Sequence, residues 1–345
     1  MRRRPLILTA IGLAALVIAY AIYWFMVARI VAQDIAGWTG YYRSQGYAVS
    51  YEVPPLSGFP FAVTARFIHP DVAAPDGRWR WQGAEVRLRI QPWAPYELQF
   101  TGLGSQKLSI AGTQAREIAI TADLLGLDVH LKDGLEADRF GFTLTHGAID
   151  DSRIGKTLVE GLTADGRFPA PPPTDATRSS LDLIAHLSRV TLPPGVDAPL
   201  GREIYSAHLV AQVMGPIPPG PPREALPAWS AAGGDVELRE VQLLWGGLWL
   251  KGDATLAFDK ALQPLFAGSF AIANIGSLLD KLVTAGILPV ATAQGAKIMF
   301  AALATTPPEG GPPQVKLPLT IQDGTLYMGP IKLAALRPLD WSWLP

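Results

Sequence analysis

The sequence predicts a mainly β protein of the α+β class, in which an antiparallel β-rich domain follows a single N-terminal transmembrane helix. Three observations predict it: 34 Gly and 31 Pro among 345 residues, short alternating apolar segments, and one long apolar run near the start. Gly and Pro together make up about 19 % of the chain, above the average of about 12 % and below the roughly 25–30 % of low-complexity chains. This content favours a turn-rich β fold over a helical bundle.

The apolar run is Leu6–Val27, and it is interrupted only by Thr9 and Gly12. As a helix it measures about 33 Å, enough for a hydrocarbon core of about 30 Å. Arg2–Arg4 precede it, so the positive-inside rule holds the N-terminus in the cytoplasm. Aromatic residues near its far end are typical of a membrane interface. They are Tyr20, Tyr23 and Trp24.

These features predict a cytoplasmic stub and transmembrane anchor over 1–32 and an exported domain over 33–345. The protein is then a single-pass inner-membrane protein whose C-terminal domain lies in the periplasm. A cleaved signal peptide is the alternative. Its apolar region usually has only about 7–15 residues, and the best cleavage candidate here, Ile30-Val31-Ala32, is poor. No second long apolar run follows, since polar residues interrupt Ala271–Leu288.

The first strands are predicted where apolar and polar residues alternate. Trp79 and Trp81 alternate with arginines, and the alternation changes phase after Gly83. Short strands that recur about every 8–12 residues suggest a meandering antiparallel sheet or a sandwich. The other candidates are Tyr47–Val53, Ala62–His69, Glu97–Thr101, Lys107–Ile110, Glu117–Thr121, Leu125–Leu131, Phe140–Leu144, Leu181–Leu192 and Tyr205–Val213.

Two hairpins are predicted in the C-terminal half. Gly246-Gly247 separates two apolar segments and suits a two-residue turn, and a change of phase at Glu240 suggests a bulge. Asp323-Gly324 forms the second turn, after a strand that contains Pro318. Because proline cannot donate to a ladder, we expect this strand at a sheet edge. Gly310-Gly311 is expected in a loose loop.

Helices are predicted mainly near residues 275–303, as a small helical hairpin packed on the sheet. The first has apolar residues at helical spacing after Asn274, which suits an N-cap, and the second follows Pro289. Asp34–Gln45 can extend the anchor helix. The Pro-rich stretches Pro169–Thr174 and Gly215–Pro222 are expected as stiff loops between parts of the sheet, with possible sub-parts 33–168 and 181–345 around them.

The sequence offers no catalytic, cofactor-binding or metal-binding residues to nominate. There is no cysteine, which excludes disulfides, thiol catalysis and Cys-ligated metals. No P-loop, no G-x-S-x-G motif and no H-E-x-x-H helix occurs. The five histidines have no metal-ligand spacing and are interpreted as structural, and Asp150-Asp151 is interpreted as part of a turn. The histidines are His69, His130, His146, His186 and His208.

Charge gives little indication of a partner. The net charge of −1 provides no field that would attract nucleic acid. The most basic local feature is a group of four arginines, interpreted as a solvated strand face with acidic partners, or alternatively as a surface for anionic lipid headgroups. They are Arg78, Arg80, Arg87 and Arg89.

A series of short motifs resembles the bacterial domain-of-unknown-function family 2125. The motifs are Gly58-Phe59-Pro60-Phe61, Trp79-x-Trp81, Pro92-Trp93-Ala94-Pro95-Tyr96 and Asp323-Gly324-Thr325-Leu326-Tyr327-Met328-Gly329-Pro330. The resemblance implies an uncharacterised, single-anchor envelope protein of Gram-negative bacteria with no catalytic residues. The chain is also distantly similar to inner-membrane proteins of the AsmA type, whose long sheets form grooves for lipid; this second link is an analogy of fold.

The functional hypothesis is therefore a non-enzymatic, membrane-tethered β protein that handles lipid or another apolar ligand in envelope maintenance. The alternative is a scaffold that binds another envelope protein through a sheet edge or a Pro-rich loop. An enzyme is the third possibility. No cofactor is implied.

Overall fold

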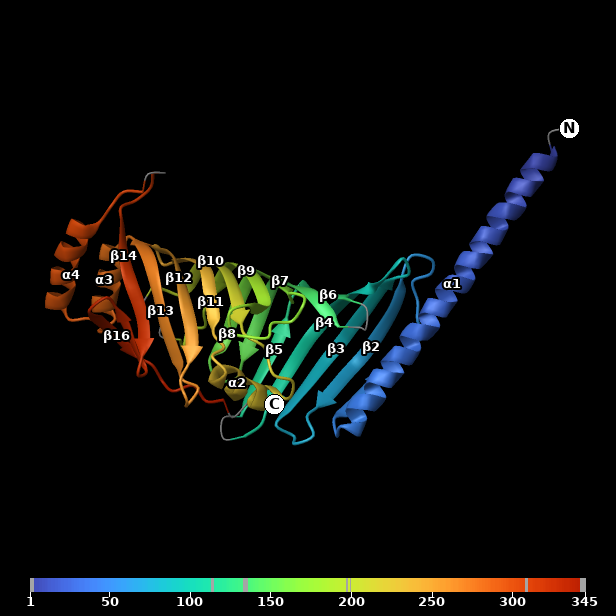
Figure 1. Cartoon of the computed structure of the whole chain (residues 1–345), viewed down its shortest axis with the longest axis horizontal. Helices are drawn as coiled ribbons and strands as arrows, with labels where there is room; N and C mark the ends of the chain where they lie inside the picture. Colours follow the sequence, from blue (N-terminus) through green and yellow to red (C-terminus); the bar gives the residue numbers. More distant parts are fainter. Residues whose placement is uncertain are drawn as a thin grey trace.

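A long helix and a single large sheet form the protein (Figure 1). The computed structural model describes residues 3–112, 115–132, 136–196, 198, 200–307 and 310–341. Helix α1 (Arg3–Ser44) lies beside one end of the sheet, and its N-terminal part extends past the strands. It contains the apolar run of the predicted anchor, and it ends at Ser44, one residue before the end of the predicted extension Asp34–Gln45. Arg2 lies outside the described residues.

The sheet is antiparallel, and nearly all its strands follow one another in chain order. This is the predicted meander, in one sheet instead of a sandwich. Strand β6 alone departs from the path, because it pairs with β4 and β7. The strands are β1 (Ala48–Glu52), β2 (Val63–Ala73), β3 (Trp79–Gln91), β4 (Ala94–Ile110), β5 (Arg116–Thr121), β6 (Leu124–Leu131), β7 (Ala137–Asp151), β8 (Gly155–Arg167), β9 (Ser179–Thr191), β10 (Glu203–Met214), β11 (Val236–Trp245), β12 (Leu248–Phe258), β13 (Pro264–Ala273), β14 (Gln314–Gln322), β15 (Thr325–Met328) and β16 (Ile331–Ala335).

The hairpin at Gly246-Gly247 is confirmed. Trp245 pairs with Leu248 across the turn, and both glycines have positive φ, 56° and 87°. These values are those of a type I′ turn, which matches the twist of the flanking strands. The predicted bulge is also present, as a register shift between Leu238 and Val241. A similar shift after Gly83 confirms the phase change in β3.

The second hairpin is confirmed at its turn and differs at its edge. Gln322 pairs with Thr325 around Asp323-Gly324. Strand β14 is not an edge strand, however, because it pairs with both β13 and β15. Proline is tolerated there because β15 is short: its ladder on β14 begins at Leu319, one residue after Pro318. The returning chain also turns again at Gly329, so that β16 forms the edge.

The helical hairpin near 275–303 is confirmed as α3 (Ile275–Thr284) and α4 (Val290–Leu303). Asn274 takes the N-cap position, but its side chain makes no capping bond. It donates instead to the Gly247 carbonyl oxygen at 2.8 Å. A helix that was not predicted, α2 (Pro222–Ala231), follows the second Pro-rich stretch, and its Trp229 donates to the Met214 carbonyl oxygen at 2.7 Å.

Several strands were missed or divided by the sequence reasoning. Strands β8 and β13 were not predicted, and the two segments predicted within residues 97–110 form one strand, β4. Strand β8 precedes the first Pro-rich stretch and β9 follows it, and nine residue pairs join the two strands. The sheet therefore continues without a break from 33–168 into 181–345.

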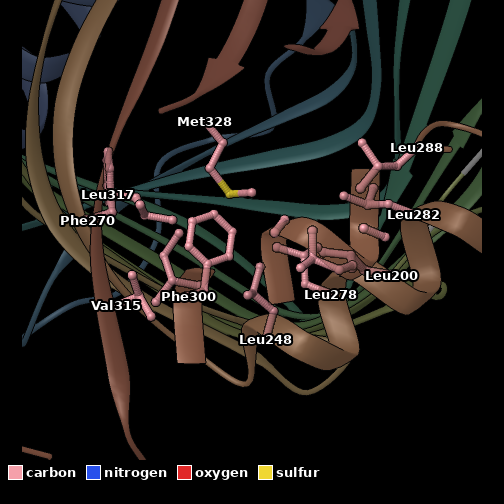
Figure 2. Packing of buried hydrophobic residues seen from close by; sticks show 14 of the residues in the cluster. Leu200, Leu248, Phe270, Leu278, Leu282, Leu288, Phe300, Val315, Leu317 and Met328 are labelled. Atoms are coloured by element: carbon pink, nitrogen blue, oxygen red, sulfur yellow. The ribbon is translucent and has the colours of Figure 1, made fainter. Parts of the chain in front are cut away.

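Buried apolar residues gather at both ends of the sheet. At the distal end, α3 and α4 cover β12–β14, where Phe270, Leu279 and Phe300 are almost fully buried (Figure 2). At the N-terminal end, Trp24 and Val31 of α1 pack on β2 and β3. A small third cluster, centred on Leu144, lies in the strands between them.

Candidate apolar surface

One face of the sheet is apolar from α1 to the distal helices α3 and α4. Residues paired across neighbouring strands lie on the same face, so the register can be followed from strand to strand. One row of paired residues begins at Val63 on β2 and reaches β16 without a polar side chain. The row is Val63, Ile90, Leu98, Val129, Phe140, Gly166, Leu183, Ala211, Leu238, Ala254, Gly268, Leu319, Met328 and Ile331.

A second row on the same face repeats this pattern two residues away on each strand, except on β11, where the bulge makes the separation three. It is Ala65, Leu88, Phe100, Leu127, Phe142, Ala164, Ala185, Leu209, Val241, Gly252, Phe270 and Leu317. The adjacent row on the opposite face is mostly polar. It is Arg66, Arg87, Thr101, Gly126, Thr143, Thr163, His186, His208, Gln242, Lys251, Ala271 and Lys316. We call the first two rows the apolar face and the other side the polar face.

Glycines let large side chains lie across the apolar face. A Cβ added at Gly166 would come within 2.2 Å of the Phe140 ring, and one at Gly102 within 2.9 Å of Leu125. A Cβ at Gly252 would lie 2.1 Å from the Ser269 carbonyl oxygen and 2.7 Å from the Phe270 ring. Glycine in a strand interior often marks such a close approach. Aromatic rings and leucine side chains therefore occupy the space above the glycines of this face.

Helices cover the apolar face at its two ends and leave its middle partly exposed. Among the described residues, α1 packs on β1 and β2, and α3 packs on β12 and on α4. Between these ends, from β6 to β10, Leu127 is 38 % exposed, and Phe142 and Leu209 are half-buried. Five strands at a spacing of about 4.8 Å make this open section about 19 Å wide, somewhat more than the ~15 Å half-thickness of a hydrocarbon core.

Helix α1 is bound tightly to the first strands. Three aromatic side chains donate hydrogen bonds to backbone carbonyl oxygens of the β1–β2 and β3–β4 loops. The bonds are Tyr20 Oη to Pro60 O at 2.6 Å, Tyr23 Oη to Pro92 O at 2.6 Å and Trp24 Nε1 to Ala62 O at 2.9 Å. The Arg43 guanidinium donates to the Val49 carbonyl oxygen of β1 at 2.6 Å. Helix α1 and the sheet therefore meet through fixed contacts.

Three of the four arginines in the predicted basic group have acidic partners on the polar face. Arg80 pairs with Asp71, Arg87 with Glu85, and Arg78, just before β3, with Asp76. The hydrogen bond from Arg80 holds the pKa of Asp71 below its usual range, and the one from Arg66 does the same for Glu85. This agrees with the interpretation of a solvated strand face.

Two shallow hollows, of about 540 and 330 Å³, are lined mainly by residues of the polar face. The larger is lined by acids and bases together, among them Asp128, Arg139 and Arg167. The smaller contains His186 and His208, whose Nδ1 atoms lie 3.1 Å apart. No group of three or more His, Asp or Glu residues that could hold a metal occurs within the described residues. Neither hollow assembles a set of groups typical of catalysis.

Asp150 and Asp151 were predicted in a turn, but they end strand β7, and the turn follows at residues 152–154. Asp151 is nearly buried and pairs with Arg116 of β5, while its other oxygen accepts from the Arg153 backbone N–H at 2.9 Å. Burial alone would raise the pKa of Asp151, but the bonds from Arg116 and Arg153 and the charge of Arg116 outweigh it and lower the pKa. The arrangement closes the β7–β8 turn and is structural.

Comparison with known proteins identifies a family. A family model described as "Uncharacterized protein conserved in bacteria (DUF2125)" matches residues 24–337, and the chain belongs to this family. No curated protein and no solved structure matches it. The helix Ile11–Ser44 is long and apolar enough to cross a membrane, which is compatible with a single-pass anchor or a signal sequence.

Proposed function

We propose that this member of the DUF2125 family is a non-enzymatic, single-pass inner-membrane protein that holds the acyl chains of phospholipids on the apolar face of its periplasmic sheet. The observation that carries the proposal is the unbroken register of apolar residues from β2 to β16. Soluble monomers rarely expose large contiguous apolar surfaces, and such surfaces mark sites for membranes, ligands or other proteins. The face begins beside the membrane helix, so phospholipid is the apolar molecule nearest to it.

The contacts of α1 support an uncleaved anchor. Trp24, Val27 and Val31 are buried against β2 and β3 in the core of the N-terminal end. Cleavage near residue 32 would remove these side chains and expose Val63 and Leu88 beneath them. Carbonate washing should therefore leave the full-length protein in the membrane pellet, and a soluble species beginning near Gln33 would contradict this part of the proposal.

The orientation has its own test. Alkaline phosphatase fused after the last residue, Pro345, should be active, because the basic residues before the anchor hold the N-terminus in the cytoplasm. A stable but inactive fusion would reverse the proposed orientation. The fusion point lies outside the described residues.

Lipid contact is tested by photocrosslinking in intact membranes. The photoreactive residue benzoylphenylalanine replaces Phe142 on the apolar face or its neighbour Thr143 on the polar face, and mass spectrometry identifies the products. These two side chains follow each other on β7 and point to opposite faces. We expect phospholipid adducts at Phe142 and few at Thr143. Equal crosslinking at both positions would contradict lipid binding on the apolar face.

A scaffold is the second candidate, and one observation favours it. Strand β16 ends the sheet and pairs only with β15 among the described strands, which leaves one side of β16 available to a strand from another envelope protein. Photocrosslinking from Lys332, an exposed residue of β16, would trap such a partner as a discrete protein adduct.

A further inference from the structure

The depth of two loops in the membrane follows from where they contact α1. The β1–β2 loop binds Tyr20 and Trp24, and the β3–β4 loop binds Tyr23. All three aromatic residues lie inside the apolar run Leu6–Val27, several residues before its end. The loops therefore lie beside a part of the helix that the membrane needs for its span.

The length of the span makes this placement necessary. If the loops were in bulk water, the membrane segment would have to end before Tyr20, which leaves Leu6–Ala19. Those 14 residues measure about 21 Å as a helix, well short of the ~30 Å hydrocarbon core. With the whole run in the membrane, Tyr20 lies about 10 Å before Val27, in the outer part of the bilayer.

The side chains of the two loops suit this environment. Phe61 is 67 % exposed and Trp93 is 59 % exposed, and Phe59 is half exposed beside the Trp24 ring, at 5.6 Å between centroids. Three large exposed aromatic side chains on two adjacent loops are unusual for a surface in water, and Trp is enriched at membrane interfaces. In Figure 1 the N-terminal part of α1 continues past this end of the sheet.

We infer that the β1–β2 and β3–β4 loops are embedded in the periplasmic leaflet, and that Phe59, Phe61 and Trp93 form a second membrane contact besides the anchor. The occupant of this surface is the lipid of the same membrane, because α1 fixes both loops to the span. This inference requires α1 to span the membrane, and it does not require lipid on the rest of the apolar face.

The absence of cysteine allows a clean test with the full chain in phospholipid nanodiscs. Phe61→Cys and Trp93→Cys each carry one environment-sensitive NBD dye, and the bilayer contains lipids with a doxyl quencher near the headgroup. The matched control is Ile298→Cys on α4, an apolar residue that is 76 % exposed at the other end of the sheet. We expect blue-shifted emission and several-fold stronger quenching at 61 and 93 than at 298.

A second measurement avoids the dye. Brominated lipids quench tryptophan, so the bromolipid quenching of the wild-type chain should decrease in Trp93→Phe, which keeps an aromatic ring. The inference would be overturned if the dye emission were the same at positions 61, 93 and 298 and if bromolipid quenching were as strong in Trp93→Phe as in the wild-type chain. That result would leave lipid crosslinking at Phe142 unaffected, so failure of the loop placement and failure of the proposed function can be told apart.

Discussion

The distal end of the sheet and its middle carry the same apolar pattern and use it differently. At the distal end α3 and α4 cover the apolar face, and Leu279 and Phe300 have no exposed surface (Figure 2). In the middle, β6–β10 have similar apolar pairs, yet Leu127 keeps 38 % of its surface exposed. The distal end is thus a conventional closed core, whereas the middle is a surface that remains available. Alternating apolar and polar residues produce the apolar face in both sections. Only the distal section is closed, because α3 and α4, which follow β13, cover it.

The largest expected effect concerns the turn that joins β11 and β12 at the distal end. Gly246→Val with Gly247→Val forces two β-branched residues to positive φ, at about 1–3 kcal/mol each. At Gly246 a Cβ would also lie 1.8 Å from the Leu200 carbonyl oxygen. Lys281 of α3 donates to the Gly246 carbonyl oxygen at 2.5 Å, so the change also disturbs the helix. Thermal unfolding should show a melting temperature lower by several degrees or more.

The matched control for this variant is the same double change at Gly310-Gly311. These glycines also have positive φ, 84° and 117°, but a Cβ at either meets nothing within 4 Å. Both double variants place valines at positive φ, so the difference between their melting temperatures reports the contacts of the β11–β12 turn with Leu200 and Lys281. Equal melting temperatures would show that the β11–β12 turn is not held against its neighbours.

The second effect measures how closed the distal core is. Phe300→Ala removes a ring with no exposed surface, and such truncations cost about 3–5 kcal/mol. Phe142→Ala, on the half-buried middle of the same face, should cost clearly less. Denaturant unfolding of the full chain in detergent measures both free energies of unfolding. Similar losses would mean that the middle is as tightly packed as the distal end.

The third effect tests whether polar contacts at the strand ends stabilise the middle. Asp151→Asn removes the charge that pairs with Arg116, and charge-assisted bonds contribute about 1.5–3 kcal/mol. Because the folded state lowers the pKa of Asp151, its contribution is present above the unfolded value of about 3.9 and is lost as the pH falls through the folded value. The difference in unfolding free energy between wild type and variant should therefore shrink below about pH 4. A difference that stays constant on acidification would assign the effect to packing.

The sequence predicted the parts of the fold that local patterns determine. The turns at Gly246-Gly247 and Asp323-Gly324, the long apolar N-terminal helix and the helical hairpin all follow from residue types within a few positions. Strand β8 was missed because Leu158 and Val159 are adjacent and Gly161 and Gly166 interrupt the alternation. Strand β13 was missed because it is rich in Ala and Gly.

The apolar face was not predicted as a site because it depends on register. A slip of one residue in any pair of strands moves a strand's side chains to the other face. Alternation was visible in most strands, but the pairing of Phe140 with Gly166, or of Leu183 with Ala211, joins strands through contacts that no local pattern specifies. The depth of the β1–β2 loop likewise depends on its bond to Tyr20, forty residues away.

The smallest expected change in stability is at Leu127, and it separates an open surface from a closed core most directly. Leu127→Gln keeps a similar volume and lets the amide reach water, because the side chain is 38 % exposed. We expect a loss of less than about 1 kcal/mol, since substitutions at exposed sites usually change stability little. An acyl chain that covered the new amide would leave it without a hydrogen-bond partner, however, so much less lipid should be recovered with the purified full-length variant.

The matched control is Thr163→Gln, exposed on the polar face of β8, which should leave both the stability and the amount of recovered lipid unchanged. A large loss of stability in Leu127→Gln would show that another part of the chain closes the middle of the face, and unchanged lipid in a stable variant would mean that lipid does not bind there.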